Sequence, residues 1–445
     1  MLPLVLGTMM NPLNSTMLIT ALTTICTHFG RDTGAGALLI TPLYIAATIG
    51  QPLMGRLADI YNPKAVNRLG FILVFIAGVI GVFAPAFEWL IVSRVILGLG
   101  TSAAYPSSMA LVTRKYRETG QTVPGEVLGI LTVASQVVMI LGPVLGGFLT
   151  SVMGWYGVFF VNIPWVIVSL YLSKAIPSYP VKKSRKPVSV LNEVDAGGIL
   201  LFGMFLVSVF ITVMKFHWFF LAALIVLLIV FMIYEWKREN PFVDVKFMYF
   251  RPRLFEVYLR ILFTNYVTYL LLYSMIQWIE VVYEKTPSEA GVLTLPMSVI
   301  SAVSAMMISK NKNLKKINAA ATIFMMITCA GLLVLSGKFP LAVIIGFTVV
   351  VGATTGTNMV ANQLSLNAEA PSGKTGVSFG LYRTFGYIGA VVSGMQLKTI
   401  FSGGITDGSL HSIGLCASVG GVLLVLLYVA KFRGVRAKPD PLKFL

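Results

Sequence analysis

The feature that most limits how this chain can fold is a series of fourteen apolar segments, most of them about 20 residues long. As a helix, a segment of this length crosses the hydrocarbon core of a bilayer. Hydrophobic residues make up 56% of the 445 residues and charged residues only 11%. A soluble fold of this size cannot bury so much apolar surface with so few charged residues to cover it. We therefore predict an all-α integral membrane protein with fourteen transmembrane helices, at residues 4–27, 36–56, 69–86, 89–112, 126–152, 156–175, 195–214, 217–235, 254–282, 288–309, 317–336, 340–366, 374–401 and 410–430.

The distribution of basic residues predicts the orientation. If the N-terminus lies in the cytoplasm, 26 of the 34 Lys and Arg residues fall in segments on that side. Cytoplasmic loops of membrane proteins carry such an excess of basic residues, so we expect a protein of the plasma membrane with both termini in the cytoplasm. The same asymmetry accounts for the net charge of +17 without a nucleic-acid partner.

The sequence lacks the residues that several classes of function require. There is no G-x-x-x-x-G-K-[ST] phosphate loop, so ATP hydrolysis within this chain is not expected to supply energy, and an ion gradient is the remaining common source. No nucleophile and base stand at usable spacing. We therefore expect no enzyme activity and no cofactor. We also expect no metal site, because the three cysteines, Cys26, Cys329 and Cys416, lie far apart in apolar runs, and the three histidines, His28, His217 and His411, have no ligand-like spacing.

Two motifs concern helix contacts. The loop Gly55–Lys64 places Asp59 at a helix end beside basic residues, where it can latch one helix to another; a solvated loop is the alternative. In Gly142-Pro143-Val144-Leu145-Gly146-Gly147, the Pro bends a membrane helix and the glycines let a neighbour come close. We treat Gly55, Asp59, Gly142, Pro143, Gly146 and Gly147 as a conformational gate, together with Arg114 and Arg117.

Arg94 lies inside the fourth apolar segment. An intramembrane arginine costs roughly 2.5–3.5 kcal/mol on insertion scales unless it is paired or faces water. Arg94 is therefore a functional candidate, and the alternative is a structural arginine held by neighbouring carbonyl groups.

These motifs, in this order, resemble those of the major facilitator superfamily. The Gly55–Lys64 loop is similar to its G-x-L-a-D-r-x-G-r-k signature, and Gly142–Gly147 to the G-P-x-x-G-G signature of its antiporters. A narrower resemblance, to the fourteen-span drug:proton antiporters, rests on Leu13–Leu22 and Trp155–Pro164. It implies a proton-coupled multidrug exporter that works by alternating access, acts as a monomer, and has small-molecule drugs, protons and the lipid bilayer as partners.

The resemblance also implies a domain organisation. It gives an N-terminal six-helix bundle (1–176), a basic cytoplasmic linker (177–193), an extra transmembrane hairpin (194–236), a second cytoplasmic linker (237–253), a C-terminal six-helix bundle (254–430) and a cytoplasmic tail (431–445). The substrate site is then expected between the two six-helix bundles.

The expected proton site is altered. The family usually has an acid at the position of Asn14, and an amide cannot titrate. Among the remaining acids, Glu126 can instead pair with Arg114 or Arg117 as part of the gate. The candidates for proton coupling are, in order, Asp32, Glu280 and Glu126, then Glu256, with Arg94 as the cation that tunes a partner.

The substrate cavity should be roomy, apolar and rich in aromatic and amide side chains, which suit flat, lipophilic, often cationic drugs. For each residue, ordinary helix packing or lipid contact is the alternative. The candidates are Asn14, Asn265, Tyr269, Tyr273, Gln277, Trp278, Tyr382, Arg383 and Phe385.

Two other functions remain open from the sequence. One is proton-coupled export of a single metabolite, lipid or siderophore. The other is a receptor or scaffold that kept the fold without transport, but a scaffold needs neither the bend at Gly142–Gly147 nor a buried charge at Arg94.

Overall fold

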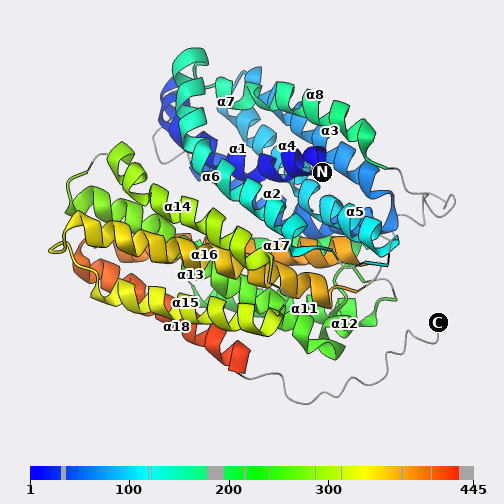
Figure 1. Cartoon of the computed structure of the whole chain (residues 1–445). Helices are drawn as coiled ribbons and strands as arrows, with labels where there is room; N and C mark the ends of the chain where they lie inside the picture. Colours follow the sequence, from blue (N-terminus) through cyan, green and yellow to red (C-terminus); the bar gives the residue numbers. More distant parts are fainter. Residues whose placement is uncertain are drawn as a thin grey trace. The chain divides into compact units, whose positions relative to one another are not determined.

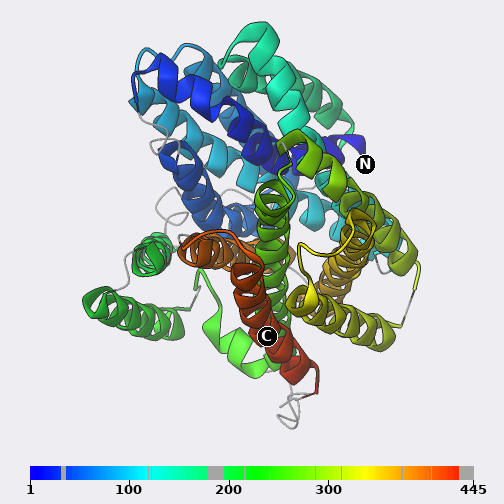
Figure 2. The ribbon, with the colours of Figure 1, turned by 90° about the vertical axis from the view of Figure 1, so that its left-hand side faces the viewer.

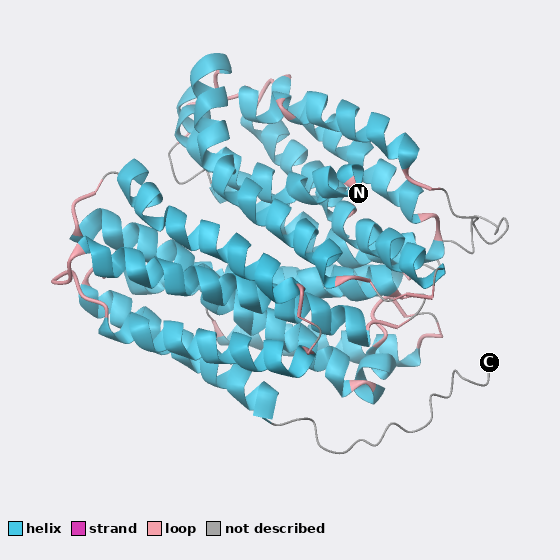
Figure 3. Ribbon diagram, viewed as in Figure 1, coloured by secondary structure: helices cyan, strands magenta, loops and turns pink. Residues whose placement is uncertain are grey.

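The computed structural model describes residues 1–31, 37–118, 120–121, 123–177, 195–214, 217–239, 241–285, 287–311, 313–371, 374–401 and 403–429. Within these ranges the chain forms helices joined by short loops, and no residue lies in a strand (Figure 3). This confirms the prediction of an all-α protein.

The first half of the chain contains the helices labelled up to α8 in Figure 1. They are α1 (Leu2–His28), α2 (Ala37–Ile60), α3 (Pro63–Val82), α4 (Phe87–Ser102), α5 (Ala104–Glu118), α6 (Gly125–Met153), α7 (Gly157–Phe160) and α8 (Asn162–Leu172), followed by the 3₁₀ turn η2 (Ser173–Ala175).

The second half continues the same pattern. Its helices are α10 (Ala196–Met214), α11 (Trp218–Lys237), α12 (Val245–Phe250), α13 (Pro252–Val282), α14 (Pro287–Ser309), α15 (Leu314–Val334), α16 (Leu341–Glu369), α17 (Thr375–Phe401) and α18 (Asp407–Val429).

The details of several predicted segments differ from the sequence-based boundaries. The fourth segment is divided into α4 and α5 at Ala103, and the sixth into α7 and α8 at Val161. Helix α3 starts at Pro63, six residues before the predicted start at 69, because the Asn62 side chain accepts a hydrogen bond from the Lys64 N–H at 3.0 Å and caps the helix. The short helix α12 lies within a stretch that was predicted as a linker.

Ten helical stretches in the described ranges are long and apolar enough to cross a membrane. The predicted segments 4–27, 126–152, 195–214 and 374–401 are also helical but are not among these ten. A multi-pass membrane protein is therefore supported, while the number of fourteen spans stays a prediction.

The chain divides into two compact units. Unit 1 contains Met1–Ser208 and Pro371–Thr384, and unit 2 contains Val209–Ala370 and Phe385–Leu445. Helices α10 and α17 begin in unit 1 and end in unit 2. The predicted domain boundaries at 176, 193, 236, 253 and 430 stay a prediction.

In unit 1, α1 and α6 run side by side (Figure 1). Gly142 and Gly146 of α6 make this possible, because a Cβ on Gly142 would overlap the Thr16 side chain and one on Gly146 would overlap the Met17 carbonyl oxygen. Gly147 has no atom of another element within 4 Å of the position where its Cβ would stand. The predicted smooth contact face therefore exists, and it is formed by two of the three glycines.

In unit 2, α13 packs beside α18, and α15 contacts both α16 and α18 (Figures 1 and 2). The buried core includes Leu270 and Trp278 of α13, Met325 of α15, and Leu410 and Ile413 of α18. The outward faces of these helices are apolar as well, with Ile323 of α15 and Leu415 of α18 exposed, so the hydrophobic pattern alone does not single out the buried face.

Because an added Cβ would overlap α1 at Gly146 and would meet no atom of another element within 4 Å at Gly147, the two glycines form a matched pair. We expect Gly146→Ala to destabilise the protein by roughly 1–3 kcal/mol, the usual cost of overpacking a close contact. Gly147→Ala should leave stability unchanged. Thermal unfolding of the purified proteins in one detergent measures both, and an equal loss in the two variants would contradict the packing described here.

Candidate functional site

The most distinctive feature of unit 1 is a reciprocal pair of amide side chains. Asn14 of α1 donates Nδ2–H to Oδ1 of Asn162 at 2.7 Å, and Asn162 of α8 donates Nδ2–H to Oδ1 of Asn14 at 2.9 Å. The two side chains are only 2% and 3% exposed. The pair thus joins α1 to α8 through two buried hydrogen bonds that need no titratable group.

Arg94 of α4 lies against the same group. Its Nε–H donates to the carbonyl oxygen of Leu39 at 3.0 Å, and its Nη2–H donates to the carbonyl oxygen of Asn14 at 3.2 Å. The residue is 2% exposed, and no carboxylate of the described residues forms an ion pair with it. Arg94 is therefore held by neighbouring carbonyls, which is the structural alternative considered from the sequence.

Further polar groups continue this layer along α1. Asn11 donates to Oγ1 of Thr101 at 2.9 Å, and the Ser15 hydroxyl donates to the Asn11 carbonyl at 2.8 Å. Tyr44 of α2 lies close to both Ser15 and Arg94. The N-terminal helix therefore carries a buried polar face.

The predicted latch residue Asp59 binds the start of α17. Its Oδ1 accepts the Gly376 N–H and its Oδ2 accepts the Val377 N–H, each at 2.8 Å. The first N–H groups of a helix have no partner within the helix, and the helix dipole favours an anion there. Gly55 and Gly376 allow the approach, because a Cβ on either would overlap the backbone of the other.

Two more contacts, at Arg383 and Thr384, join α17 to other helices of unit 1. The guanidinium of Arg383 lies 3.9 Å from the centre of the Tyr105 ring, and the Thr384 hydroxyl donates to the Thr48 carbonyl at 2.9 Å. Tyr382 is buried. The substrate candidates Tyr382 and Arg383 therefore lie in the same segment that Asp59 binds.

The remaining gate candidates lie around α5 and α6. The Nε of Arg114 lies 3.6 Å from Oε1 of Glu118, Arg117 is exposed, and Glu126 is exposed in the first turn of α6. No ion pair joins Glu126 to either arginine among the described side chains, which differs from the pairing expected from the sequence. Helix α6 continues through Pro143 without a break.

In unit 2, several substrate candidates lie on α13. The rings of Tyr269 and Tyr273 are 5.7 Å apart, and Phe385 stacks on Tyr258 at 5.4 Å. Asn265 lies against Gly386, where an added Cβ would meet its Nδ2. Gln277 is half-buried.

Trp278 has a different environment from the one expected. It is fully buried, and its Nε1–H donates to Oδ1 of Asp407 at 3.1 Å. The same carboxylate accepts the Ser336 hydroxyl at 2.7 Å and the Gly337 N–H at 3.0 Å. Burial, and then the Asp407 charge, raise the pKa of the Tyr283 hydroxyl above its ordinary value. Trp278 is thus part of a polar anchor at one end of unit 2.

The acids proposed for proton coupling lie in separate places. Asp32 falls outside the described residues. Glu280 is half-buried near the end of α13, and Glu256 is half-buried near its beginning, in the wall of a cavity of unit 2. Among the described residues, no group of three or more His, Cys, Asp or Glu side chains is arranged to hold a metal ion.

Two important residues were not identified from the sequence. Asn162 lies in the Trp155–Pro164 segment and was not singled out there, although an amide inside an apolar segment is a signal that it needs a partner. Asp407 starts α18, and an acid in the first turn of an apolar helix is a capping signal.

The amide pair predicts a specific energetic coupling. Asn14→Ala and Asn162→Ala should each cost roughly 1–3 kcal/mol, because each leaves a buried amide without its partner. The double variant should lose less than the sum. Denaturant unfolding of the four proteins measures the coupling. Asn11→Ala with Asn162→Ala is the control and should be additive, because Asn11 bonds to Thr101; additive losses for the Asn14–Asn162 pair would contradict the direct contact.

The Asp59 latch predicts a local change in dynamics. We expect Asp59→Ala to speed amide exchange in the first turn of α17, because the Gly376 and Val377 N–H groups lose their acceptor. Hydrogen-exchange mass spectrometry on peptides from 374–384 measures this. Asp407→Ala should leave these peptides unchanged, and unchanged exchange in Asp59→Ala would rule out the latch.

Comparison with known proteins gives the family. The Major Facilitator Superfamily model matches residues 4–394. The uncharacterized MFS-type transporter YwoD of Bacillus subtilis is 29% identical over 434 residues, which is 95% of this chain and 94% of that protein. The riboflavin transporter RibZ of Clostridioides difficile is 25% identical over 83% of this chain and 81% of its own length.

A relative named for multidrug export matches a smaller share of this chain. The multidrug export protein EmrB of Escherichia coli K12 is 24% identical over 68% of this chain and 60% of its own length. Among solved structures, the human organic anion transporter MFSD10 has a TM-score of 0.65 at 14% identity, covering 95% of this chain and 98% of that one, which supports the fold alone. The match of the family model over most of the chain shows that this protein belongs to the major facilitator superfamily of membrane transporters.

Proposed function

We propose that the protein exports lipophilic, often cationic, drugs across the plasma membrane in exchange for protons, by alternating access. The energy comes from the proton gradient, with no cofactor, and the chain works as a monomer with both termini in the cytoplasm. Export by a multidrug relative, EmrB, supports the substrate class.

The observation that carries the proposal is the packing of α6 on α1. Gly142 and Gly146 belong to the segment that resembles the antiporter signature, and both contact the helix that carries Asn14. A face without side chains allows two helices to slide or tilt against each other at close range. Exchange of two substrates by one site needs such a rearrangement.

The residue that carries the proton is the part of the proposal in which this chain differs from the family it resembles. Asn14 is an amide bound to Asn162, so the proton is carried elsewhere. Asp32 is our first choice, then Glu280 and Glu126, with Glu256 a further candidate. Arg94 contributes a buried positive charge that lowers the proton affinity of any acid brought near it.

A second candidate function is the export of one metabolite with the same coupling. The relative RibZ, named as a riboflavin transporter, covers more of this chain than EmrB does and favours this alternative. A scaffold without transport has no comparable support, since the chain belongs to a family of transporters and the gate that we propose at Asp59 and at the α1–α6 contact would have no use in a static scaffold.

Drug-dependent proton movement in reconstituted liposomes tests the proposal. With an imposed pH gradient, we expect the wild type to couple drug transport to proton flux, and Asp32→Asn to abolish the coupling while drug binding remains measurable, because an amide carries no proton. Glu280→Gln and Glu126→Gln are the parallel acid variants. Full coupled transport by Asp32→Asn would reject Asp32 as the carrier. A wild-type protein that moves no protons, or that moves them equally with and without drug, would reject exchange. A panel of drugs and flavins separates the two substrate classes.

A further inference from the structure

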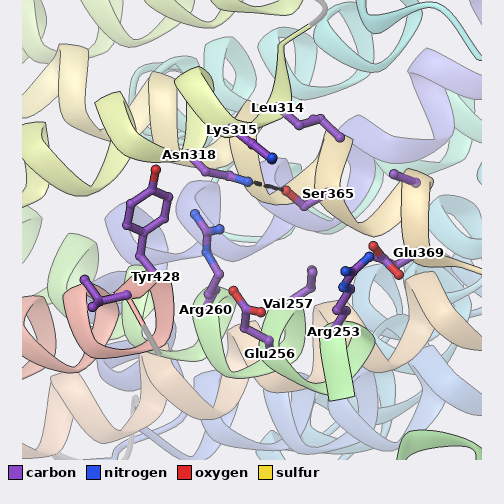
Figure 4. Close-up of a pocket in the computed structure, with 12 residues that line it drawn as sticks. Arg253, Glu256, Val257, Arg260, Leu314, Lys315, Asn318, Ser365, Glu369 and Tyr428 are labelled. Carbon is purple, nitrogen blue, oxygen red and sulfur yellow. Dashed lines mark hydrogen bonds between the residues drawn. The ribbon is translucent and has the colours of Figure 1, made fainter. Parts of the chain in front are cut away.

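Unit 2 contains a cavity of about 720 Å³ whose lining includes Glu256, the last of the proton-coupling candidates, and none of the substrate candidates. It lies where α13 and α15 begin and α16 and α18 end (Figure 4). The volume is far larger than an inorganic phosphate ion and suits a small organic group. The four helices that line it all belong to unit 2.

Three cations line the cavity. Arg253 and Arg260 lie seven residues apart, on the same face of α13, and Lys315 is in the first turn of α15. Arg260 is only 4% exposed, so its guanidinium is a buried charge that requires polar surroundings. In Figure 4 it extends toward Asn318 and Tyr428.

Two carboxylates share the same wall. Glu256 lies between the two arginines along α13 and is close enough to Arg253, Arg260 and Glu369 for their charges to act on it. Glu369 is the last residue of α16, and Figure 4 shows Arg253 and Glu369 pointing toward one another. The lining therefore presents both signs of charge within one small volume.

Neutral hydrogen-bonding groups complete the lining. Asn318 donates Nδ2–H to Oγ of Ser365 at 3.1 Å, and Tyr428 supplies a phenol at the end of α18. The predicted topology places this end of unit 2 at the cytoplasmic face of the membrane. Phospholipid head groups lie at that depth, and aromatic residues are common there.

From this arrangement we propose that the cavity binds a zwitterion that carries a phosphate ester and a primary ammonium group, either as the head group of an aminophospholipid or as a free aminoalkyl phosphate. The arginines bind phosphate oxygens through paired N–H donors, and Lys315 adds a third positive charge. Glu256 and Glu369 accept hydrogen bonds from the ammonium group. A simple anion meets two carboxylates in this cavity, and a simple cation meets three basic groups, so the mixed lining favours a ligand with both charges.

Native mass spectrometry of the full chain in detergent tests the proposal with three lipids of identical acyl chains. Phosphatidylethanolamine should bind about tenfold more tightly than phosphatidylglycerol, which lacks the amine, and phosphatidylcholine, whose quaternary amine has no N–H to donate. Equal binding of the three lipids, or tighter binding of phosphatidylglycerol, would overturn the proposal.

Single substitutions assign the two halves of the ligand. Arg260→Gln should weaken the binding of phosphatidylethanolamine about tenfold. Arg253→Gln repeats the test at an exposed position, where the substitution should not disturb folding. Glu256→Gln and Glu369→Gln should weaken phosphatidylethanolamine but strengthen phosphatidylglycerol. If the glutamate variants bind both lipids more tightly, the cavity is an anion site and the proposed zwitterion site is wrong.

Lys315 and Lys316 provide a matched control. Both are exposed residues of the first turn of α15, and only Lys315 lines the cavity. Lys315→Gln should weaken the binding of phosphatidylethanolamine, and Lys316→Gln should not. Equal effects of the two substitutions would indicate attraction by diffuse surface charge and would contradict a specific site in the cavity. Soluble phosphoethanolamine is the second arm: displacement of the lipid shows that the head group alone binds, while lipid binding without displacement assigns the site to the membrane lipid.

Discussion

Unit 1 is organised around a buried guanidinium that has carbonyl groups as its partners. Arg94 reaches the main chains of two other helices, α1 at Asn14 and α2 at Leu39. A charge buried in a membrane protein is costly unless its donors are satisfied, so the backbone positions of α1 and α2 are both tied to this side chain. The carbonyl of Asn14 that receives Arg94 belongs to the residue whose side chain binds α8, so one position of α1 connects three helices.

This arrangement has a consequence for proton coupling. A carboxylate at position 14 would gain or lose a charge beside Arg94 as the pH changed, and the contact with α8 would change with it. The Asn14–Asn162 pair keeps the same donors and acceptors at any ordinary pH. These contacts of α1 with α4 and α8 therefore do not depend on protonation, and the proton coupling that we propose requires an acid outside this pair.

The sequence was sufficient for the helices and insufficient for their polar contacts. Long apolar segments predict helices because the bilayer leaves few other folds for them, and each predicted segment is mostly helical over its described residues. The face of α6 was also predictable, since glycines at 142 and 146 have a local meaning. The partner of Asn14 was not, because Asn162 is 148 residues away and an amide can bond to many groups. For the same reason, Trp278 resembled a substrate aromatic, although its indole N–H is bound by Asp407, 129 residues further on.

The two half-buried aspartates, Asp59 and Asp407, differ in a way that bears on motion. Asp407 receives donors from the Trp278 indole, the Ser336 hydroxyl and the Gly337 main chain, so several elements of unit 2 must move together to release it. Asp59 receives only two main-chain N–H groups, at the first turn of one helix. Main-chain donors at a helix start are exchangeable for water when the helix withdraws, and no side chain has to change its rotamer. A carboxylate bound in this way can be released and bound again without repacking side chains, which is the property that the gate role proposed for Asp59 requires.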